Sequence, residues 1–167
     1  MFPFQDRIYS LIPSRDGRLL FIHLLNGMVF QLALDDMNLT DWIKGNFPEP
    51  CVQLDCVGEH LIGLAASGRL YCNGKEIQNA VSSFVIHSDF LLFTSVQNHR
   101  LLCTPLANLN QFSADAGCSE RKVERGAKLI HAVAIGTTVV LQMPRGNLEA
   151  VHPRSLTLNI LSRLIDR

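Results

Sequence analysis

The sequence predicts an all-β fold, a β-propeller of about four blades that leads into the first helix of an α-helical solenoid. Three observations favour this fold. One unit recurs along the chain, built from two apolar strands, a tight polar turn and a third strand. The inner strands of these units are continuous apolar runs, which is typical of sheets covered on both faces by neighbouring sheets. Towards the C-terminal end the spacing of apolar residues changes to that of a helix.

The turns of the repeated unit set its length. They lie at Asn26-Gly27, Ser67-Gly68, Asn98-His99 and Arg145-Gly146, which are 41, 31 and 47 residues apart. These intervals scatter around the roughly 40 to 50 residues of a propeller blade. An insertion from Thr104 to Glu120 accounts for the longest of them. A β-sandwich also spaces short strands regularly, but the repeat length and the terminal helix favour the propeller.

Each unit contributes three predicted strands. We expect them at Ile8–Ile12, Leu19–His23 and Met28–Leu32, at Val52–Cys56, His60–Ala65 and Arg69–Cys72, at Val81–His87, Phe90–Ser95 and Arg100–Thr104, and at Leu129–Ile135, Thr138–Met143 and Leu148–Val151. The runs Leu91-Leu92-Phe93 and Val139-Val140-Leu141 have the pattern of strands buried on both faces. The candidates for outer, fourth strands are Lys75–Gln78 and Lys122–Arg125.

The period changes at Pro153, which stands where a first helical turn tolerates a missing N–H. The apolar residues that follow at helical spacing are Leu156, Ile160, Leu161, Leu164 and Ile165. We therefore expect propeller blades over residues 1–152 and the start of a solenoid over residues 153–167. The apolar face of this helix should pack on the last blade or on the next helix.

The composition indicates a globular protein with no net charge. The chain is 47% hydrophobic and 18% charged, with 15 basic and 15 acidic residues. A domain that grips nucleic acid by its backbone usually has a basic excess, so this chain is a poor candidate for a main nucleic-acid contact. The basic residues Arg121, Lys122, Arg125 and Lys128 are interpreted as a solvated charged strand, because acidic residues interrupt them. Arg145 is a candidate contact for a protein or for RNA.

The cysteines and the N-terminal segment indicate a reducing compartment. The five cysteines, Cys51, Cys56, Cys72, Cys103 and Cys118, form no C-x-x-C pair, which suits free thiols. No stretch has the length and apolarity of a signal peptide or of a transmembrane helix. We expect a cytoplasmic protein, with the nucleus as an alternative, and no membrane partner.

Three residue groups have the composition of reactive sites, and each has a structural interpretation. His87-Ser88-Asp89 holds the residue types of a catalytic triad, but neighbours on a strand point apart, so a turn is expected. Gly63–Gly68 departs from the G-x-S-x-G spacing and reads as a hairpin. Cys51, Cys56 and His60 lack a partner pair to complete a tetrahedral metal site. The sequence therefore assigns no catalytic, cofactor-binding or metal-binding residue and predicts that the protein is not an enzyme.

The segments RKVERGAKLI and VVLQMPRGNLEAVHPRSL, within residues 121–156, carry a resemblance to a known family. They are similar to the junction in the Elongator complex protein 1 (IKAP) family where a WD40-like second β-propeller ends and an α-solenoid begins. The resemblance is sharp over residues 121–158 and looser upstream, as in Ser88–Thr94. After Pro153 the chain departs from the family, which usually continues with a second histidine and a helix richer in charge and alanine. The Trp-Asp dipeptide of WD40 repeats is also absent, since Trp42 follows Asp41.

The resemblance implies a non-catalytic scaffold that supports modification of the wobble uridine of tRNA to its 5-carboxymethyl-type forms. The implied partners are the catalytic subunit and the propeller-containing second subunit of Elongator, with tRNA contacted only weakly or indirectly here. The family homodimerises through a C-terminal part that this chain lacks. Since four blades are fewer than a closed ring usually has, we expect a partial propeller with open, association-prone edges.

Three other functions are alternatives to this one. A propeller-plus-solenoid scaffold of a vesicle-coat or transport complex would share the architecture without these segments. An enzyme that uses a propeller channel needs acidic or histidine residues on several inner strands, which here are nearly all aliphatic. A direct RNA-binding module needs aromatic and basic residues interleaved on one face.

Overall fold

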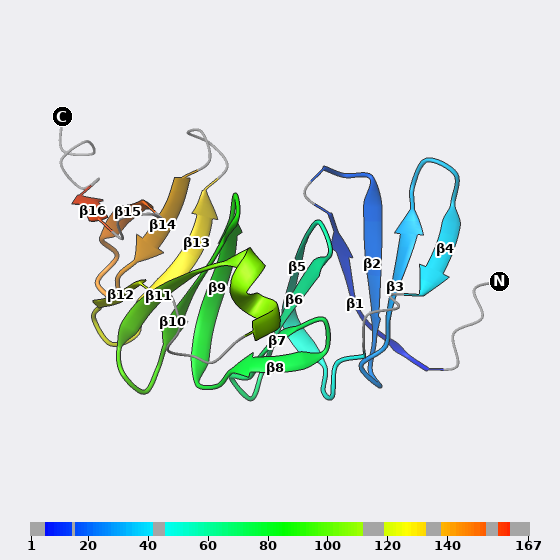
Figure 1. The fold of residues 1–167 in the computed structure, drawn as a ribbon, viewed down its shortest axis with the longest axis horizontal. Coiled ribbons are helices and arrows are strands. Elements are labelled where there is room, and N and C mark those ends of the chain that lie inside the picture. Colours follow the sequence, from blue (N-terminus) through cyan, green and yellow to red (C-terminus); the bar gives the residue numbers. More distant parts are fainter. Residues whose placement is uncertain are drawn as a thin grey trace. The chain divides into compact units, whose positions relative to one another are not determined.

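The computed structural model describes residues 6–14, 16–41, 46–111, 119–132, 138–152 and 157–160. Over these residues the chain forms four sheets, each of four antiparallel strands that follow one another in sequence order (Figure 1). The chain divides into two compact units, Met1–Ile77 and Gln78–Arg167. Repetition of one four-stranded meander is the blade pattern that the sequence predicts.

The first unit contains two of the sheets. Its strands are β1 (Ile8–Pro13), β2 (Leu19–Leu24), β3 (Val29–Ala33) and β4 (Asn38–Asp41), then β5 (Cys51–Val57), β6 (His60–Ala65), β7 (Leu70–Cys72) and β8 (Lys75–Gln78). Strand β1 pairs with β2, and β5 with β6, each with a register shift near the start of the first strand.

The second unit contains the other two sheets. Its strands are β9 (Val81–His87), β10 (Phe90–Ser95), β11 (Arg100–Pro105) and β12 (Ser119–Lys122), then β13 (Lys128–Ala132), β14 (Thr138–Gln142), β15 (Leu148–His152) and β16 (Thr157–Ile160). A 3-10 helix, η1 (Leu106–Gln111), follows β11. The inner strands of the two sheets, β9 and β13, lie against each other.

The hairpins between the second and third strands share a common geometry in three of the four sheets. In three of them the N–H of a glycine donates to the carbonyl three residues earlier, over 3.0, 3.0 and 2.9 Å for Gly27, Gly68 and Gly146. These glycines have φ angles of 88°, 85° and 87°, which residues with a Cβ rarely adopt. The β10–β11 hairpin is one residue longer and places His99 at this position with φ 49°. All four predicted turns are therefore confirmed.

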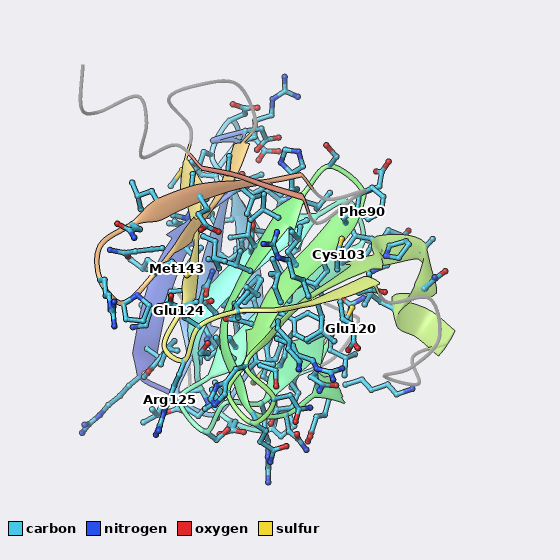
Figure 2. All side chains as sticks on the ribbon, turned by 90° about the vertical axis from the view of Figure 1, so that its left-hand side faces the viewer. Phe90, Cys103, Glu120, Glu124, Arg125 and Met143 are labelled. Atoms are coloured by element: carbon cyan, nitrogen blue, oxygen red, sulfur yellow. The ribbon has the colours of Figure 1, made fainter. Side chains whose placement is uncertain are left out.

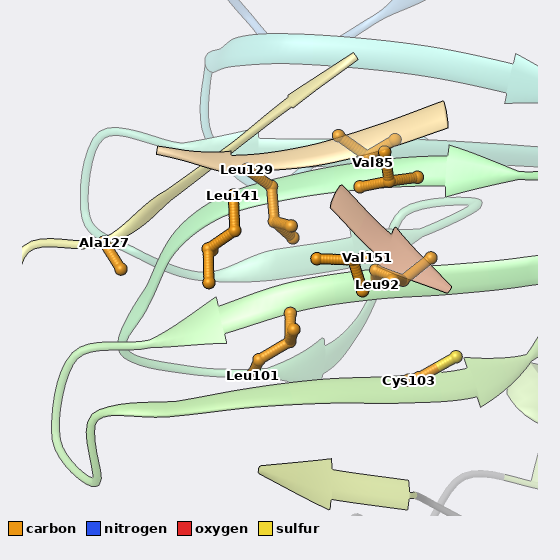
Figure 3. Packing of buried hydrophobic residues seen from close by; sticks show 9 residues of the cluster. Val85, Leu92, Leu101, Cys103, Ala127, Leu129, Leu141 and Val151 are labelled. Carbon is orange, nitrogen blue, oxygen red and sulfur yellow. The ribbon is translucent and has the colours of Figure 1, made fainter. Parts of the chain in front are cut away.

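The inner strand β10 is buried on both faces, as its continuous apolar run predicts. Leu91, Leu92 and Phe93 of β10 are all 0% exposed. In the second unit, side chains from β9–β11 meet side chains from β13–β15 in one cluster, where Leu92 and Leu101 face Leu141 (Figure 3). Packing two sheets face to face removes both inner faces from water and fixes the blades against each other.

The predicted helix at residues 153–167 is wrong where the structure describes it. Residues 157–160 form strand β16, which pairs with β15 from Glu149↔Ile160 to His152↔Thr157. Strand β16 satisfies the outer hydrogen-bonding edge of β15, and its residues alternate between polar Thr157 and Asn159 and apolar Leu158 and Ile160. Residues 153–156 and 161–167 lie outside the described residues, so a solenoid beyond the blades stays a prediction.

The outer strands were the hardest elements to predict. Lys75–Gln78 is confirmed as β8. The fourth strand of the third sheet is Ser119–Lys122, whereas Lys122–Arg125 was predicted. The two segments overlap only at Lys122, because the chain turns away after it towards β13. Strand β4, Asn38–Asp41, was not predicted, since its short polar sequence has no apolar run.

Candidate functional site

A pocket of about 160 Å³ lies at one end of the β9–β12 sheet. Three segments line it: Ser82 at the start of β9, residues 94–96 with His99 of the β10–β11 hairpin, and residues 123–127 between β12 and β13. All three belong to the second unit. The pocket exists because the longer hairpin and the link to the next sheet come together at the same end of the meander.

A chain of hydroxyl groups forms the polar wall of the pocket. Thr94 Oγ1 lies 2.7 Å from Ser82 Oγ and 2.6 Å from Ser83 Oγ. Ser83 Oγ also accepts a hydrogen bond of 2.9 Å from the backbone N–H of Leu129, the second residue of β13. These bonds tie three strands together and satisfy hydroxyl groups that would otherwise be buried without partners.

Backbone hydrogen bonds hold the other walls. The N–H of Val123 donates to the His99 carbonyl over 2.8 Å, and the N–H of Val96 donates to the Ala80 carbonyl over 2.7 Å. The same two bonds occur in the first sheet, where Phe47 donates to Gly27 and Leu25 donates to Arg7, each over 2.9 Å. The loops around the pocket are therefore fixed by the same contacts that occur in the first sheet.

Two residues of the pocket lining, Glu124 and Arg125, are charged. Both are exposed, and Met143 of the neighbouring sheet lies beside this loop (Figure 2). Lys122 and Lys128, the residues flanking the loop in sequence, are exposed too. The predicted charged strand over residues 121–128 is thus partly wrong. Only its first two residues lie in a strand, and the others lie in a loop or begin β13.

A second polar cluster lies in the first unit, beside the β6–β7 hairpin. Glu49 Oε1 accepts hydrogen bonds from Tyr71 Oη over 2.6 Å and from Ser67 Oγ over 2.7 Å. These two bonds hold the pKa of the Glu49 carboxyl below its usual value. Burial and the bond to Glu49 raise the pKa of Tyr71 to about 12. Arg69 lies 3.9 Å from both Glu49 and Glu76, so the cluster joins the hairpin to the segment before β5.

His23, on β2, is fully buried, and neither of its ring nitrogens has a hydrogen-bond partner. Its ring meets the edges of Tyr9 and Phe47, with centroids 5.8 and 5.7 Å away. Burial lowers the pKa of His23 because a charged imidazolium would lose its hydration here. The ring therefore acts as an apolar core side chain at neutral pH.

The groups that resemble reactive sites take structural roles. Ser88, of His87-Ser88-Asp89, sits in the β9–β10 turn with φ 51°, and Gly63–Gly68 runs along β6 into its hairpin. Of the candidate metal ligands, His60 contacts a cysteine outside that set, Cys72, at 3.8 Å from Sγ to Nδ1. Among the described residues no group of three or more His, Cys, Asp or Glu side chains could hold a metal ion.

The cysteines of the described segments are free thiols. Cys51, Cys72 and Cys103 are buried and Cys56 is half-buried, while Cys118 lies outside the described residues. Burial raises the pKa of Cys51 to about 12 and the pKa values of Cys56 and Cys72 to about 11. These three thiols are protonated at neutral pH and are poor nucleophiles. Arg145 is exposed in the β14–β15 hairpin, as a surface contact requires.

Within the described part of the chain, no helix has both the length and the apolarity needed to cross a membrane.

Comparison with solved structures shows the fold. The β-propeller domain of Cps50 (Swd1) from Myceliophteria thermophila superposes with a TM-score of 0.61 at 14% identity, over 92% of this chain and 57% of that chain. The Pan2 WD40 domain of Neurospora crassa gives a TM-score of 0.54 at 14% identity, over 92% of this chain and 49% of that chain. The chain thus has WD40-like propeller blades.

Comparison of sequences shows the family. A family model described as the ELP1 N-terminal second beta-propeller matches residues 4–130. An elongator complex protein 1 of Xenopus laevis is 38% identical over 72% of this chain and 11% of its own length. The Mus musculus elongator complex protein 1 is 32% identical over 89% of this chain and 12% of its own length. The chain therefore spans about a tenth of the length of these relatives. It belongs to the Elongator complex protein 1 family, in the region of the second β-propeller.

Proposed function

We propose that this chain is a non-catalytic scaffold part of the Elongator complex, which supports 5-carboxymethyl-type modification of the wobble uridine of tRNA. The observation that carries the proposal is the family match over residues 4–130, joined to relatives that all bear the name of this one subunit. A vesicle-coat scaffold would share the blade architecture but not this family. The proposed location is the cytoplasm, with the nucleus as an alternative.

The chemistry of the chain supports a scaffold. The thiols of Cys51, Cys56 and Cys72 are held protonated by burial. His23 is neutral and packed between aromatic rings. The sheets instead present rigid loops fixed by repeated backbone bonds, which is what a surface that holds partners needs. The partners we propose are the catalytic subunit and the propeller-containing second subunit, with tRNA contacted weakly or indirectly.

The test is mass spectrometry of wobble nucleosides in tRNA from cells that lack this gene product. We expect loss of the 5-carboxymethyl-type uridines and their return when the gene is restored. Modified nucleosides elsewhere in the same tRNAs serve as the control and should not change. Co-purification of the other Elongator subunits with the tagged gene product tests the scaffold role separately. Unchanged wobble nucleosides, or a tagged product that brings down none of the subunits, would contradict the proposal.

A further inference from the structure

We propose that the pocket at the end of the β9–β12 sheet is a docking site for an acidic linear peptide that inserts one aliphatic side chain. This site goes beyond the proposed scaffold function, because it specifies the chemistry of a ligand and the residues that would hold it. The pocket, its apolar rim and the charge around it support the proposal in turn.

The volume of the pocket fits a single side chain of a partner. A volume of about 160 Å³ is smaller than the roughly 300–1,000 Å³ of sites for cofactors and drug-sized molecules. An apolar cavity of about 150 Å³ is known to hold a group the size of benzene. A single leucine, isoleucine or valine side chain is a group of this size, so one side chain of a partner chain fits the pocket.

The lining favours an apolar group. Val96 is 53% exposed at the rim, and Val123 and Ala127 contribute apolar surface from the opposite loop. The hydroxyl groups of Ser82 and Thr94 on the polar wall are already hydrogen-bonded to each other. An aliphatic side chain that covers them therefore leaves neither group without a partner, and it removes Val96 from water.

The pocket is formed before any ligand arrives. Three backbone hydrogen bonds fix its loops. They run from the N–H of Val123 to the His99 carbonyl over 2.8 Å, from Val96 to Ala80 over 2.7 Å and from Ala127 to Glu124 over 3.1 Å. A peptide that enters does not have to order these loops, so more of its contact energy remains as affinity.

The charges around the pocket favour an acidic peptide. Lys122, Arg125 and Lys128 are exposed on the loop or next to it, against the exposed carboxylate of Glu124. The other acidic residue of this segment, Glu120, is in an ion pair with Arg100. The local field is therefore positive although the whole chain is neutral, and it attracts carboxylates on either side of the inserted residue. A nucleic acid would need aromatic stacking platforms, and the described lining residues include no Phe, Tyr or Trp.

Fluorescence anisotropy of the 167-residue chain with labelled probe peptides tests the site. The first probe is Glu-Asp-Leu-Glu-Asp, and its matched probes replace the central leucine by alanine or all four acidic residues by lysine. We expect the alanine probe to bind about tenfold more weakly, the loss expected for removing most of one buried leucine side chain. The lysine probe should not bind measurably, and binding of the first probe should weaken as salt rises.

Matched variants locate the binding. Val96→Ser and Arg125→Glu should each lower the affinity for the leucine probe at least about fivefold. The first variant removes apolar surface from the rim, and the second reverses a rim charge. Val52→Ser is the control for the first variant, because Val52 is 56% exposed and lies on β5. Arg7→Glu is the control for the second, because Arg7 is exposed and does not line the pocket. Thermal unfolding of each variant verifies that it is folded. NMR of the valine methyl groups locates the bound peptide without any substitution. We expect the peptide to change the chemical shifts of Val96 and Val123.

Three results would overturn the proposal. The first is equal affinity for the leucine and alanine probes. The second is equal weakening by Val52→Ser and Val96→Ser. The third is tighter binding of an oligouridine RNA than of the acidic peptide, which would assign the basic rim to nucleic acid.

Discussion

His23 is a buried titratable group without a hydrogen-bond partner, and its protonation destabilises the first unit in acid. Burial lowers its pKa from the ordinary value of 6.5, so the unfolded chain binds a proton at a pH where the folded chain does not. The stability that the neutral ring contributes is complete above pH 6.5. It is lost as the pH falls from there towards the lower pKa of the folded state.

We predict that His23→Phe makes the chain less sensitive to acid, because phenylalanine can keep the aromatic contacts without titrating. The measurement is the urea midpoint of unfolding at pH 7.5 and at pH 5.5 for both proteins. The native chain should lose more stability between these values than the variant. Asp16 and Glu49 also have lowered pKa values, but the stability that they contribute is lost only as the pH falls below their ordinary pKa values of 3.8 and 4.5, outside this window. An identical loss in both proteins would refute the prediction.

Gly27 and Gly146 occupy the same place in two hairpins, with φ angles of 88° and 87°, but differ in their surroundings. A Cβ at Gly27 would lie 1.8 Å from the carbonyl oxygen of Phe47, whereas a Cβ at Gly146 would meet nothing within 4 Å. Gly146→Ala should therefore cost only the left-handed strain, about 1–2 kcal/mol. Gly27→Ala should cost roughly 3 kcal/mol or more, because the segment that carries Phe47 must also move. Chemical denaturation of the two variants checks this, and equal losses would contradict it.

At the scale of the elements, a buried hydroxyl group joins two sheets of the second unit. Ser83 on β9 accepts the backbone N–H of Leu129 on β13 and also contacts Thr94. Ser83→Ala leaves that N–H without its acceptor, and we predict a loss of about 1–3 kcal/mol. Ser82→Ala is the matched control. Ser82 is exposed, and without its hydroxyl Thr94 still has its hydrogen bond with Ser83, so a loss below about 1 kcal/mol is expected. Urea denaturation distinguishes the two, and equal losses would show that the bond between sheets is not important.

The apolar strands could be predicted from the sequence because their pattern is set by burial. The centre of β10, Leu91-Leu92-Phe93, is apolar because both of its faces are covered, and the hairpin that follows has a residue with positive φ. The outer strands could not be predicted in this way. Strands β4 and β16 are held by backbone hydrogen bonds to one neighbour, which leave little trace in the side chains. The leucine and isoleucine spacing after Pro153 matched a helix over a stretch where edge pairing forms a strand.

The pocket could not be predicted, because it brings together Ser82, the β10–β11 hairpin and residues 123–127. No sequence motif marks such a meeting of three segments. At position 99 the repeated turn has histidine where the other three have glycine, but four other non-glycine residues of the described chain also have positive φ, so this difference does not mark the pocket.

At the scale of the whole molecule, the same sheet occurs four times over the described segments, so we predict a pattern of hydrogen exchange that also repeats. Strands β2, β6, β10 and β14 are paired on both sides within their sheets, and β4, β8, β12 and β16 on one side only. Amides of the first set should exchange most slowly and amides of the second set fastest. Exchange measured by mass spectrometry on peptides from each strand checks this. Protection that falls evenly from one end of the chain to the other would contradict it.

The order of strands within each sheet also bears on how the chain is made. Every strand pairs with its neighbour in sequence, so no sheet needs residues from another sheet to complete its ladder. Short loops between paired strands keep the contact order of each sheet low, which favours fast folding. During synthesis, when domains form from the N-terminal end, each blade can assemble as soon as its own fourth strand leaves the ribosome. The nascent chain would then add one finished blade at a time, and within each unit the first blade would give the second an apolar face to fold against.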